Sequence, residues 1–382
     1  NMRINFEEFF TNTLAEGTYE MKIVATDGVS QETEKTFVLE VSGAPVQGNE
    51  VSASSLGFTS ATLTGTILDN TASGFGFELR QAATRSYEDW TPIAATVNGS
   101  KLTATVNDLV AGTTYEYRVV ATKADGTRFE GKTLSFETVS YPQLPNGGFE
   151  DWSGSSPMFI CANEASMFWD SGNHGSKTMG KDVTEKDTSV KHSGNYSAKL
   201  KSQFVGLGSI GRFAAGNAFV GKYLKTDGTD GILGWGRPWN PEARPKALKG
   251  WIKYSPGTVQ DKVFTKVPNF TPSELKEEFP TGSHDKAIIY IALVDHSKVD
   301  VEYKDFPVII KTKVPQLFDK NGSNVKAYGE MIVSEATPGD DMIEFTINLT
   351  DVNPGAFSHI MIVASASKAG DYFLGGEGST LW

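Results

Sequence analysis

Two tryptophans, an arginine and an asparagine share one irregular segment of this chain. The segment is ILGWGRPWNPEARP at 232–245, which places Trp235, Arg237, Trp239 and Asn240 among glycines and prolines. Saccharide recognition needs flat apolar faces for the C–H side of a sugar and a few fixed polar groups for its hydroxyls. The segment supplies both and is a candidate sugar-binding loop. The alternative is that the indoles plug the edge of a β-sandwich, because tryptophan is usually well buried.

Two further segments combine aromatic and polar side chains. The residues of interest are Trp169, Asp170, Asn173 and His174 in FWDSGNHGSK at 168–177, and Tyr372, Phe373 and Glu377 in KAGDYFLGGEG at 368–378. In each segment a ring can face a sugar while a carboxylate or amide binds its hydroxyls. Both segments are also rich in glycine. A long turn whose Asp and Asn side chains bond their own backbone is therefore the competing interpretation.

Catalytic residues cannot be assigned from spacing. A glycosidase needs two carboxylates about 5–5.5 Å or about 6.5–9.5 Å apart, and no sequence spacing selects a pair among Asp170, Glu242, Glu277 and Glu377. The five histidines are scattered, so no ligand set for zinc stands out. Cys161 is the only cysteine and has no evident base. These observations favour a binding protein over an enzyme and leave the catalytic residues unknown.

Composition limits the classes of partner. The 382 residues carry 35 basic and 46 acidic side chains, a net charge of −11, and no basic stripe, so nucleic acid is a poor partner. One cysteine allows no intrachain disulfide. No run of about 18 apolar residues is present, so we expect no transmembrane span.

Alternating apolar residues predict an all-β chain of tandem sandwiches. Residues 1–42 contain a hairpin with a turn at Asp27-Gly28 and resemble partial immunoglobulin-like strands, either a truncated module or one that leans on its neighbour. Residues 43–140 alternate like an immunoglobulin or fibronectin type III sandwich. Within them, LVAGTTYEYRVVA resembles the fibronectin tyrosine corner, in which the Tyr115 hydroxyl would bond the backbone.

Residues 141–382 predict a larger jelly-roll sandwich with long loops. Apolar strands recur in it, and helix is scarce. One helix is expected at 271–279, with Thr271 as its cap and Glu274 closing a capping box. The boundary falls at PNGGFEDW, where Pro145 and two glycines interrupt the strand pattern.

Several phrases of this last region resemble a known family. NGGFEDW at 146–152, KHSGNYSAKL at 191–200 and GDYFLGGEGSTLW at 370–382 are similar to galactose-binding-like jelly rolls. Together with AAGNAFVGKY at 214–223 and GWGRPWNPEARPKALKGWIKY at 234–254, they resemble the putative carbohydrate metabolism domain family.

The resemblance implies a carbohydrate-binding protein at the cell surface or in the periplasm, as in surface proteins of gut Bacteroidetes, with a lipid anchor upstream of this chain. It implies that the glycan, an oligo- or polysaccharide, meets aromatic-lined loops of the jelly roll. It also implies no cofactor beyond a structural calcium held by Glu150 with backbone carbonyls and an acid on the final strand. Two alternatives stay open. One is a glycoside hydrolase-type enzyme using a carboxylate pair in the same groove, and the other is an adhesion or assembly protein.

Overall fold

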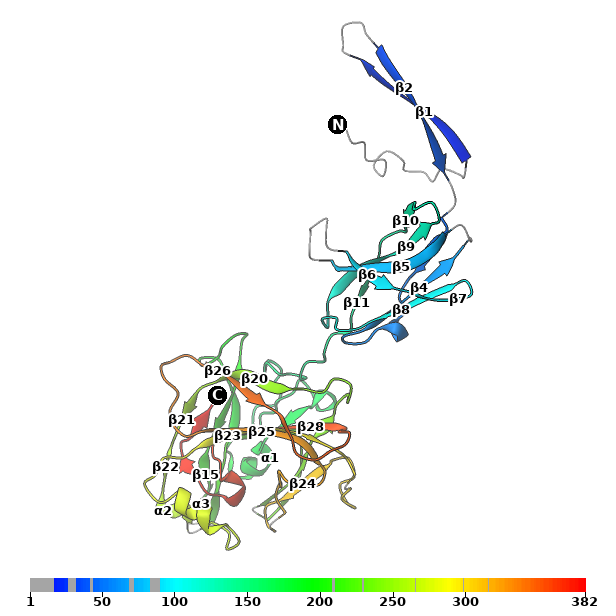
Figure 1. The fold of residues 1–382 in the computed structure, drawn as a ribbon. Coiled ribbons are helices and arrows are strands. Elements are labelled where there is room, and N and C mark those ends of the chain that lie inside the picture. The colour runs from blue at the N-terminus through cyan, green and yellow to red at the C-terminus, as the bar shows by residue number, and fades with distance from the viewer. Residues whose placement is uncertain are drawn as a thin grey trace. The chain divides into compact units, whose positions relative to one another are not determined.

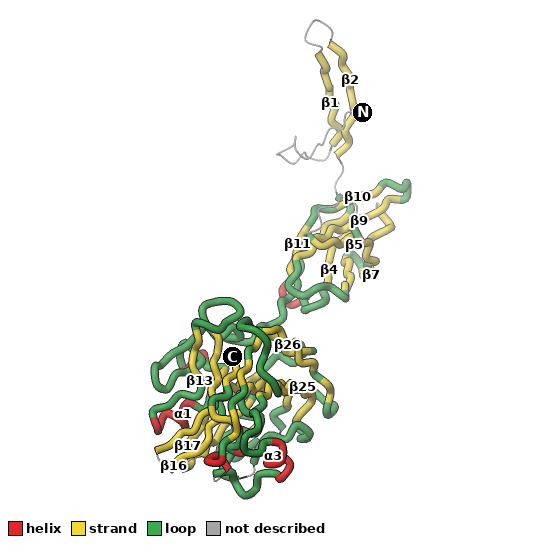
Figure 2. Tube along the Cα trace, turned by 90° about the vertical axis from the view of Figure 1, so that its left-hand side faces the viewer, coloured by secondary structure: helices red, strands yellow, loops and turns green. Residues whose placement is uncertain are grey.

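The protein is all-β and forms two compact units, Asn1–Tyr141 and Pro142–Trp382 (Figure 1). The structure is a computed structural model. It describes residues 17–26, 32–41, 44–68, 72–82, 90–207, 210–228, 230–264, 266–297, 299–314 and 316–382. The short helices of the C-terminal unit lie at its periphery, around the strands (Figure 2). The expected all-β sandwich class is confirmed.

The first strands form a hairpin. β1 (Gly17–Thr26) pairs antiparallel with β2 (Glu32–Val41), so that Gly17 lies opposite Val41. The turn expected at Asp27-Gly28 lies outside the described residues.

The rest of the N-terminal unit is a two-sheet sandwich. One sheet runs in the order β3 (Val46–Asn49), β4 (Ala61–Ile67), β8 (Lys101–Val106) and β7 (Thr96–Asn98). The other runs β10 (Arg128–Glu130), β9 (Thr114–Lys123), β5 (Ala72–Gln81) and β6 (Thr91–Ala94), with β11 (Leu134–Glu137) also on β9. The expected tyrosine corner is present, because the Tyr115 hydroxyl accepts a hydrogen bond from the Val110 N–H at 3.0 Å.

The C-terminal unit is built on a sheet of nine described strands. Its order is β24 (Val308–Lys311), β18 (Asp230–Trp235), β17 (Asn217–Asp227), β28 (His359–Ser365), β23 (Ala287–Val294), β25 (Val325–Val333) and β27 (Thr350–Asp351). Two short strands extend it, namely β12 (Trp169–Asp170) on β17 and β19 (Arg237–Pro238) on β28.

Smaller sheets form the second layer and the edges. A four-stranded sheet runs β13 (Thr184–Asp187), β14 (Ser197–Lys201), β30 (Thr380–Leu381) and β21 (Tyr254–Ser255). Three strand pairs complete the unit: β15 (Gln203–Leu207) with β16 (Ile210–Ala214), β20 (Ala247–Ile252) with β26 (Ile343–Asn348), and β22 (Thr258–Val259) with β29 (Gly376–Glu377).

The helices of this unit are short. They are α1 (Asn173–Ser176), α2 (Asp261–Phe264) and α3 (Ser273–Glu278), with single 3-10 turns that include η5 (Gly370–Tyr372). The helix expected at 271–279 is therefore present but shorter. Its expected capping box is wrong, because no side chain caps the first turn and the Thr271 hydroxyl is buried without a partner among the described residues.

The large sheet is buried on both faces, and its strands alternate between two apolar clusters. On β23, Ile289 and Ile291 enter the main core together with Leu200 and Leu381 of the four-stranded sheet. Tyr290, between them, points to the opposite face and joins a second cluster. This second face carries the cavity described next.

Candidate functional site: an aromatic cavity on the large sheet

A cavity of about 710 Å³ lies on the second face of the large sheet. Its floor is made by side chains of the sheet, namely Phe219, Tyr223, Leu233, Trp235, Ile288, Tyr290, Tyr328 and Val363. Its walls come from strands β15 and β16, from parts of the segments 172–183, 318–321 and 367–373, and from Thr226, Gly228, Asp230 and Gly231. Ligand sites commonly have about 300–1,000 Å³ of space, so this cavity can take a small molecule. We call it the aromatic cavity.

Stacked rings dominate the floor. The Tyr290 ring lies 5.6 Å from that of Phe318 with the planes 5° apart, and 5.9 Å from that of Tyr328. Trp235 meets Tyr290 edge-on at 6.4 Å. Phe318 and Tyr328 are only partly buried, so their rings retain exposed surface inside a largely apolar recess.

Polar groups surround these rings. The Tyr328 hydroxyl donates to Glu330 at 2.7 Å, and Lys320 pairs with the same carboxylate at 2.8 Å. Burial raises the pKa of Glu330, but the hydrogen bonds from Lys320 and Tyr328 outweigh it and leave the pKa below its usual value. Asp371 is the opposite case. Burial alone raises its pKa to about 6. The cavity therefore holds two carboxyls in different environments.

One indole N–H at the cavity has no acceptor. Trp235 is 2% exposed and lines the floor, yet its Nε1 is buried without a hydrogen-bond partner among the described residues. A buried donor without an acceptor costs roughly 1–3 kcal/mol.

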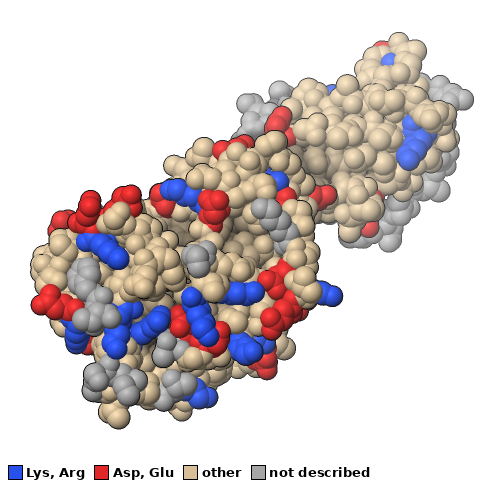
Figure 3. Space-filling view, turned by 90° about the horizontal axis from the view of Figure 1, so that it is seen from below, with Lys and Arg blue, Asp and Glu red and all other residues tan. Residues whose placement is uncertain are grey.

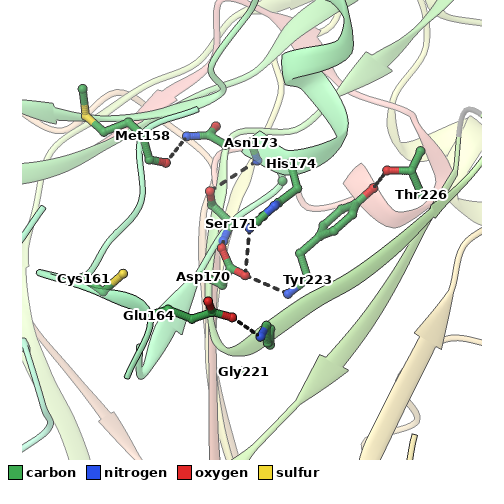
Figure 4. Close-up of polar contacts among 12 residues, drawn as sticks. Met158, Cys161, Glu164, Asp170, Ser171, Asn173, His174, Gly221, Tyr223 and Thr226 are labelled. Carbon is green, nitrogen blue, oxygen red and sulfur yellow. Dashed lines mark hydrogen bonds and ion pairs between the residues drawn. The ribbon is translucent and has the colours of Figure 1, made fainter. Parts of the chain in front are cut away.

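A polar network supports one wall. Asp170 is 1% exposed and accepts from the backbone N–H groups of Ser171 and Tyr223, both at 2.8 Å (Figure 4). His174 Nε2 lies 3.4 Å from Asp170 Oδ2 without the alignment of a hydrogen bond, and its ring stacks on Tyr223 at 5.2 Å. The network fixes Tyr223, whose ring lines the cavity.

The four candidate side chains of the 168–177 segment support the fold, whereas Gly172, Gly175 and Ser176 of the same segment line the cavity. Trp169 is 4% exposed and its Nε1 donates to the Pro145 carbonyl at 2.9 Å, which ties the segment to the start of the unit. Asn173 is fully buried and its amide oxygen accepts from the N–H groups of Val183 and Thr184. Trp169, Asp170, Asn173 and His174 are not among the residues that line the cavity.

The 232–245 segment divides between the two faces of the sheet. Trp235 lines the cavity, but Trp239 packs against the main core and its Nε1 donates to the Ala243 carbonyl at 2.9 Å. Arg237 donates to the Gly221 carbonyl at 3.1 Å, and burial lowers its pKa. Asn240 accepts from the Glu242 N–H in a local turn. Of the three tryptophans proposed to meet a sugar, only Trp235 lines this cavity, whereas Trp169 belongs to the main core and Trp239 packs against it.

The 368–378 segment reaches the cavity at one end only. Tyr372 and Phe373 line it, and the Arg212 guanidinium lies 4.4 Å from the Phe373 ring centroid. Glu377 belongs to β29, pairs with Lys262 and does not line the cavity.

Glu150 holds a turn. Its carboxylate accepts from the N–H groups of Asn195 and Tyr196 at 2.9–3.2 Å, and these bonds lower its pKa. Calcium takes six to eight oxygen ligands, and the described residues contain no group of three or more His, Cys, Asp or Glu placed to hold a metal ion. The calcium at Glu150 stays a prediction, and nothing below depends on it.

Surface charge is mixed on the C-terminal unit. On the face seen in Figure 3, acidic and basic side chains are interspersed rather than gathered by sign. Within the described part of the chain, no helix is long and apolar enough to cross a membrane.

Sequence reasoning missed most of the cavity. Tyr290, Phe318, Tyr328, Glu330 and Asp371 were not among the candidates, although all five line it. A signal existed for Tyr290, since AIIYIALV at 287–294 is apolar at every position and so predicts a strand buried on both faces. An aromatic side chain on the second face of such a strand is a candidate for the floor of a cavity.

Comparison with known proteins identifies the C-terminal unit. The putative carbohydrate metabolism domain matches residues 148–382, so the chain belongs to this family. The family supports a carbohydrate-related role.

Structural similarity covers mainly short parts of the chain. A fibronectin type III domain of the human fibronectin type III domain containing protein 3 is 22% identical over 26% of this chain and 92% of its own, with a TM-score of 0.20. The sensor domain of an anti-sigma factor from Pseudobacteroides cellulosolvens is also 22% identical. The match covers 26% of this chain and 99% of the sensor domain, with a TM-score of 0.19. A cycloalternan-degrading enzyme from Trueperella pyogenes is 8% identical. The match covers 81% of this chain and 31% of the enzyme, with a TM-score of 0.20. No curated protein matches the chain.

Proposed function

We propose that the C-terminal unit binds a saccharide in the aromatic cavity. The observation that carries the proposal is the partly exposed pair of rings, Phe318 and Tyr328, packed on Tyr290 inside a recess of about 710 Å³. Aromatic faces suit the C–H surface of a pyranose, and the recess removes that surface from water. The family membership of residues 148–382 supports the same class of ligand.

Polar groups for the sugar hydroxyls come from the same walls. Glu330 and Asp371, which both line the cavity, offer acceptors. Such a site resembles small-ligand pockets, in which a few fixed polar groups orient a ligand held by apolar contact. The recess supports this function over an adhesion surface, for which a flat apolar patch is the expected feature.

A glycan array of the full chain, followed by calorimetry on the hits, tests the proposal. Binding in the micromolar to millimolar range, roughly −8 to −4 kcal/mol, is expected. Competition by a single saccharide for all hits is expected if one cavity is responsible. A blank array and no calorimetric signal would overturn the proposal.

A carbohydrate-active enzyme is the second candidate. The observation in its favour is the contrast between Asp371, whose pKa is raised to about 6, and Glu330, whose pKa is lowered, in one cavity. Acid–base catalysis uses carboxyls whose environments push their pKa values apart. Release of reducing sugar from a bound glycan, lost in Asp371→Asn, would establish it.

We also propose a cell-surface or periplasmic location, with a lipid anchor upstream of this chain. Family membership and the spacer-like sandwich support it. Fractionation of cells with an antibody against the C-terminal unit tests it, and recovery with the cytoplasmic fraction would rule it out.

A further inference from the structure

The basic side chains of the aromatic cavity are already engaged. Among the described residues that line it, the cations each contact a carboxylate: Arg212 with Asp230 at 2.9 Å, Lys320 with Glu330 at 2.8 Å, and Lys368 with Glu278 at 2.7 Å. A ligand with a carboxylate or sulfate group would have to compete with these pairs. The cavity therefore offers no ready counter-charge for an anionic sugar.

Asp371, a carboxylate that lines the cavity, has no such partner. Asp371, in η5, makes no hydrogen bond or ion pair with another described residue. No nearby cation offsets the burial that raises its pKa. Asp371 lines the same cavity as Tyr290 and Tyr372, and its charge, after burial, raises the pKa of both tyrosines. A partly desolvated carboxylate without a counter-ion attracts a cation.

The rings add to this attraction. Aromatic faces attract cations placed within about 6 Å of the ring centroid. At this cavity the arrangement already occurs twice, with Arg212 over Phe373 at 4.4 Å and Lys320 over Tyr328 at 5.4 Å. The cavity thus combines aromatic faces that favour positive charge with the unpaired carboxylate of Asp371.

We propose that the aromatic cavity selects a saccharide bearing a protonated amine, a hexosamine with a free amino group, whose ammonium lies between Asp371 and the floor rings. The inference rests on the proposed saccharide binding and adds the class of sugar. Neutral sugars lack the ion pair to Asp371. Uronic acids place a second negative charge beside it.

Calorimetry on the full chain at pH 7 with matched sugars tests the inference. The gluco set is glucosamine, N-acetylglucosamine, glucose and glucuronic acid, and the galacto set has the same four substituents. In the set that fits, we expect the amine to bind at least tenfold more tightly than the hydroxyl or acetamide form, about 1.4 kcal/mol. The uronic acid should bind most weakly.

The outcomes separate the two proposals. Equal or tighter binding of the hydroxyl or acetamide form overturns the amine inference and leaves saccharide binding in place. No binding in either set, together with a blank glycan array, overturns both.

A pair of variants locates the effect. Asp371→Asn should abolish the preference for the amine over the hydroxyl form, because the amide keeps the shape of the carboxylate and loses its charge. Asp319→Asn is the matched control, since Asp319 also lines the cavity but is exposed and accepts from the Asn321 N–H in its own turn. Retention of the amine preference in Asp371→Asn would overturn the assignment. Thermal unfolding confirms that both variants fold.

Discussion

The rings of Tyr290 and Phe318 lie parallel, with centroids 5.6 Å apart and planes 5° apart. Tyr290 is held in strand β23, whereas Phe318 comes from the segment that follows β24. The aromatic surface of the cavity thus combines a ring of the sheet, Tyr290, with a ring of a wall segment, Phe318. This contact provides the most direct way to alter the cavity without disturbing the sandwich core.

Phe318→Ala should weaken saccharide binding about tenfold or more, because it removes one stacking face. Phe318 is only partly buried, so the free energy of unfolding should fall less than for a fully buried phenylalanine, whose truncation costs about 3–5 kcal/mol. Calorimetry and urea unfolding measure the two effects. Trp251→Ala is the control, since Trp251 is 46% exposed and does not line the cavity. Equal affinity in Phe318→Ala and the parent would exclude this ring from the site.

Asp371 should make stability depend on pH in an unusual direction. Its pKa is about 6 in the folded chain against an ordinary value of 3.8, so the folded state binds the proton more tightly than the unfolded state. The stabilisation is therefore complete below pH 3.8 and is lost as the pH rises through 6. The amide of Asp371→Asn does not titrate, so the variant lacks this contribution to the pH dependence of stability. The stability of the parent relative to the variant should fall between pH 4 and pH 7 in urea unfolding, and a difference that is constant or grows with pH would contradict the assignment.

The fold could be read from the sequence because its signals are local. Alternation in stretches such as TTYEYRVVATK and the spacing of Leu109, Gly112 and Tyr115 depend on neighbouring residues, and both predict the sandwich that is observed. Strand β23 is likewise marked by its own run of apolar residues.

The cavity could not be read in the same way, because it is assembled from distant segments. Tyr290, Phe318 and Asp371 are brought together by strand order and by two wall segments, which no local pattern encodes. Trp169 and Trp239 stand out in the sequence, yet each indole N–H is satisfied by a backbone carbonyl of a structural turn. These two tryptophans of Gly-rich segments therefore fix the local backbone and do not line the cavity.

A buried carboxylate network should be essential for stability. Asp285 is fully buried and accepts from Ser367 Oγ at 2.5 Å, the Gly376 N–H at 2.7 Å and Ser379 Oγ at 2.8 Å. Asp285→Asn replaces one acceptor with an N–H group that faces these donors, so we expect a loss of about 2–4 kcal/mol in the free energy of unfolding. Asp305→Asn, at an exposed position, should change it by less than about 0.5 kcal/mol. Urea unfolding of both variants checks this, and similar curves would refute it.

The tyrosine corner allows the two units to be tested separately. Tyr115→Phe removes the hydroxyl that accepts from the Val110 N–H at 3.0 Å and leaves the ring, which stacks on Phe136 at 5.7 Å. We expect the N-terminal unit to lose about 0.5–1.5 kcal/mol, the usual net contribution of one hydrogen bond. Because residues 142–382 form their own compact unit, the C-terminal unit should keep its stability and its affinity for saccharide. Calorimetric unfolding with and without a bound sugar distinguishes the units, since only the transition of the C-terminal unit should shift upward with ligand. A mutation that lowered both transitions equally would show that the two units unfold as one.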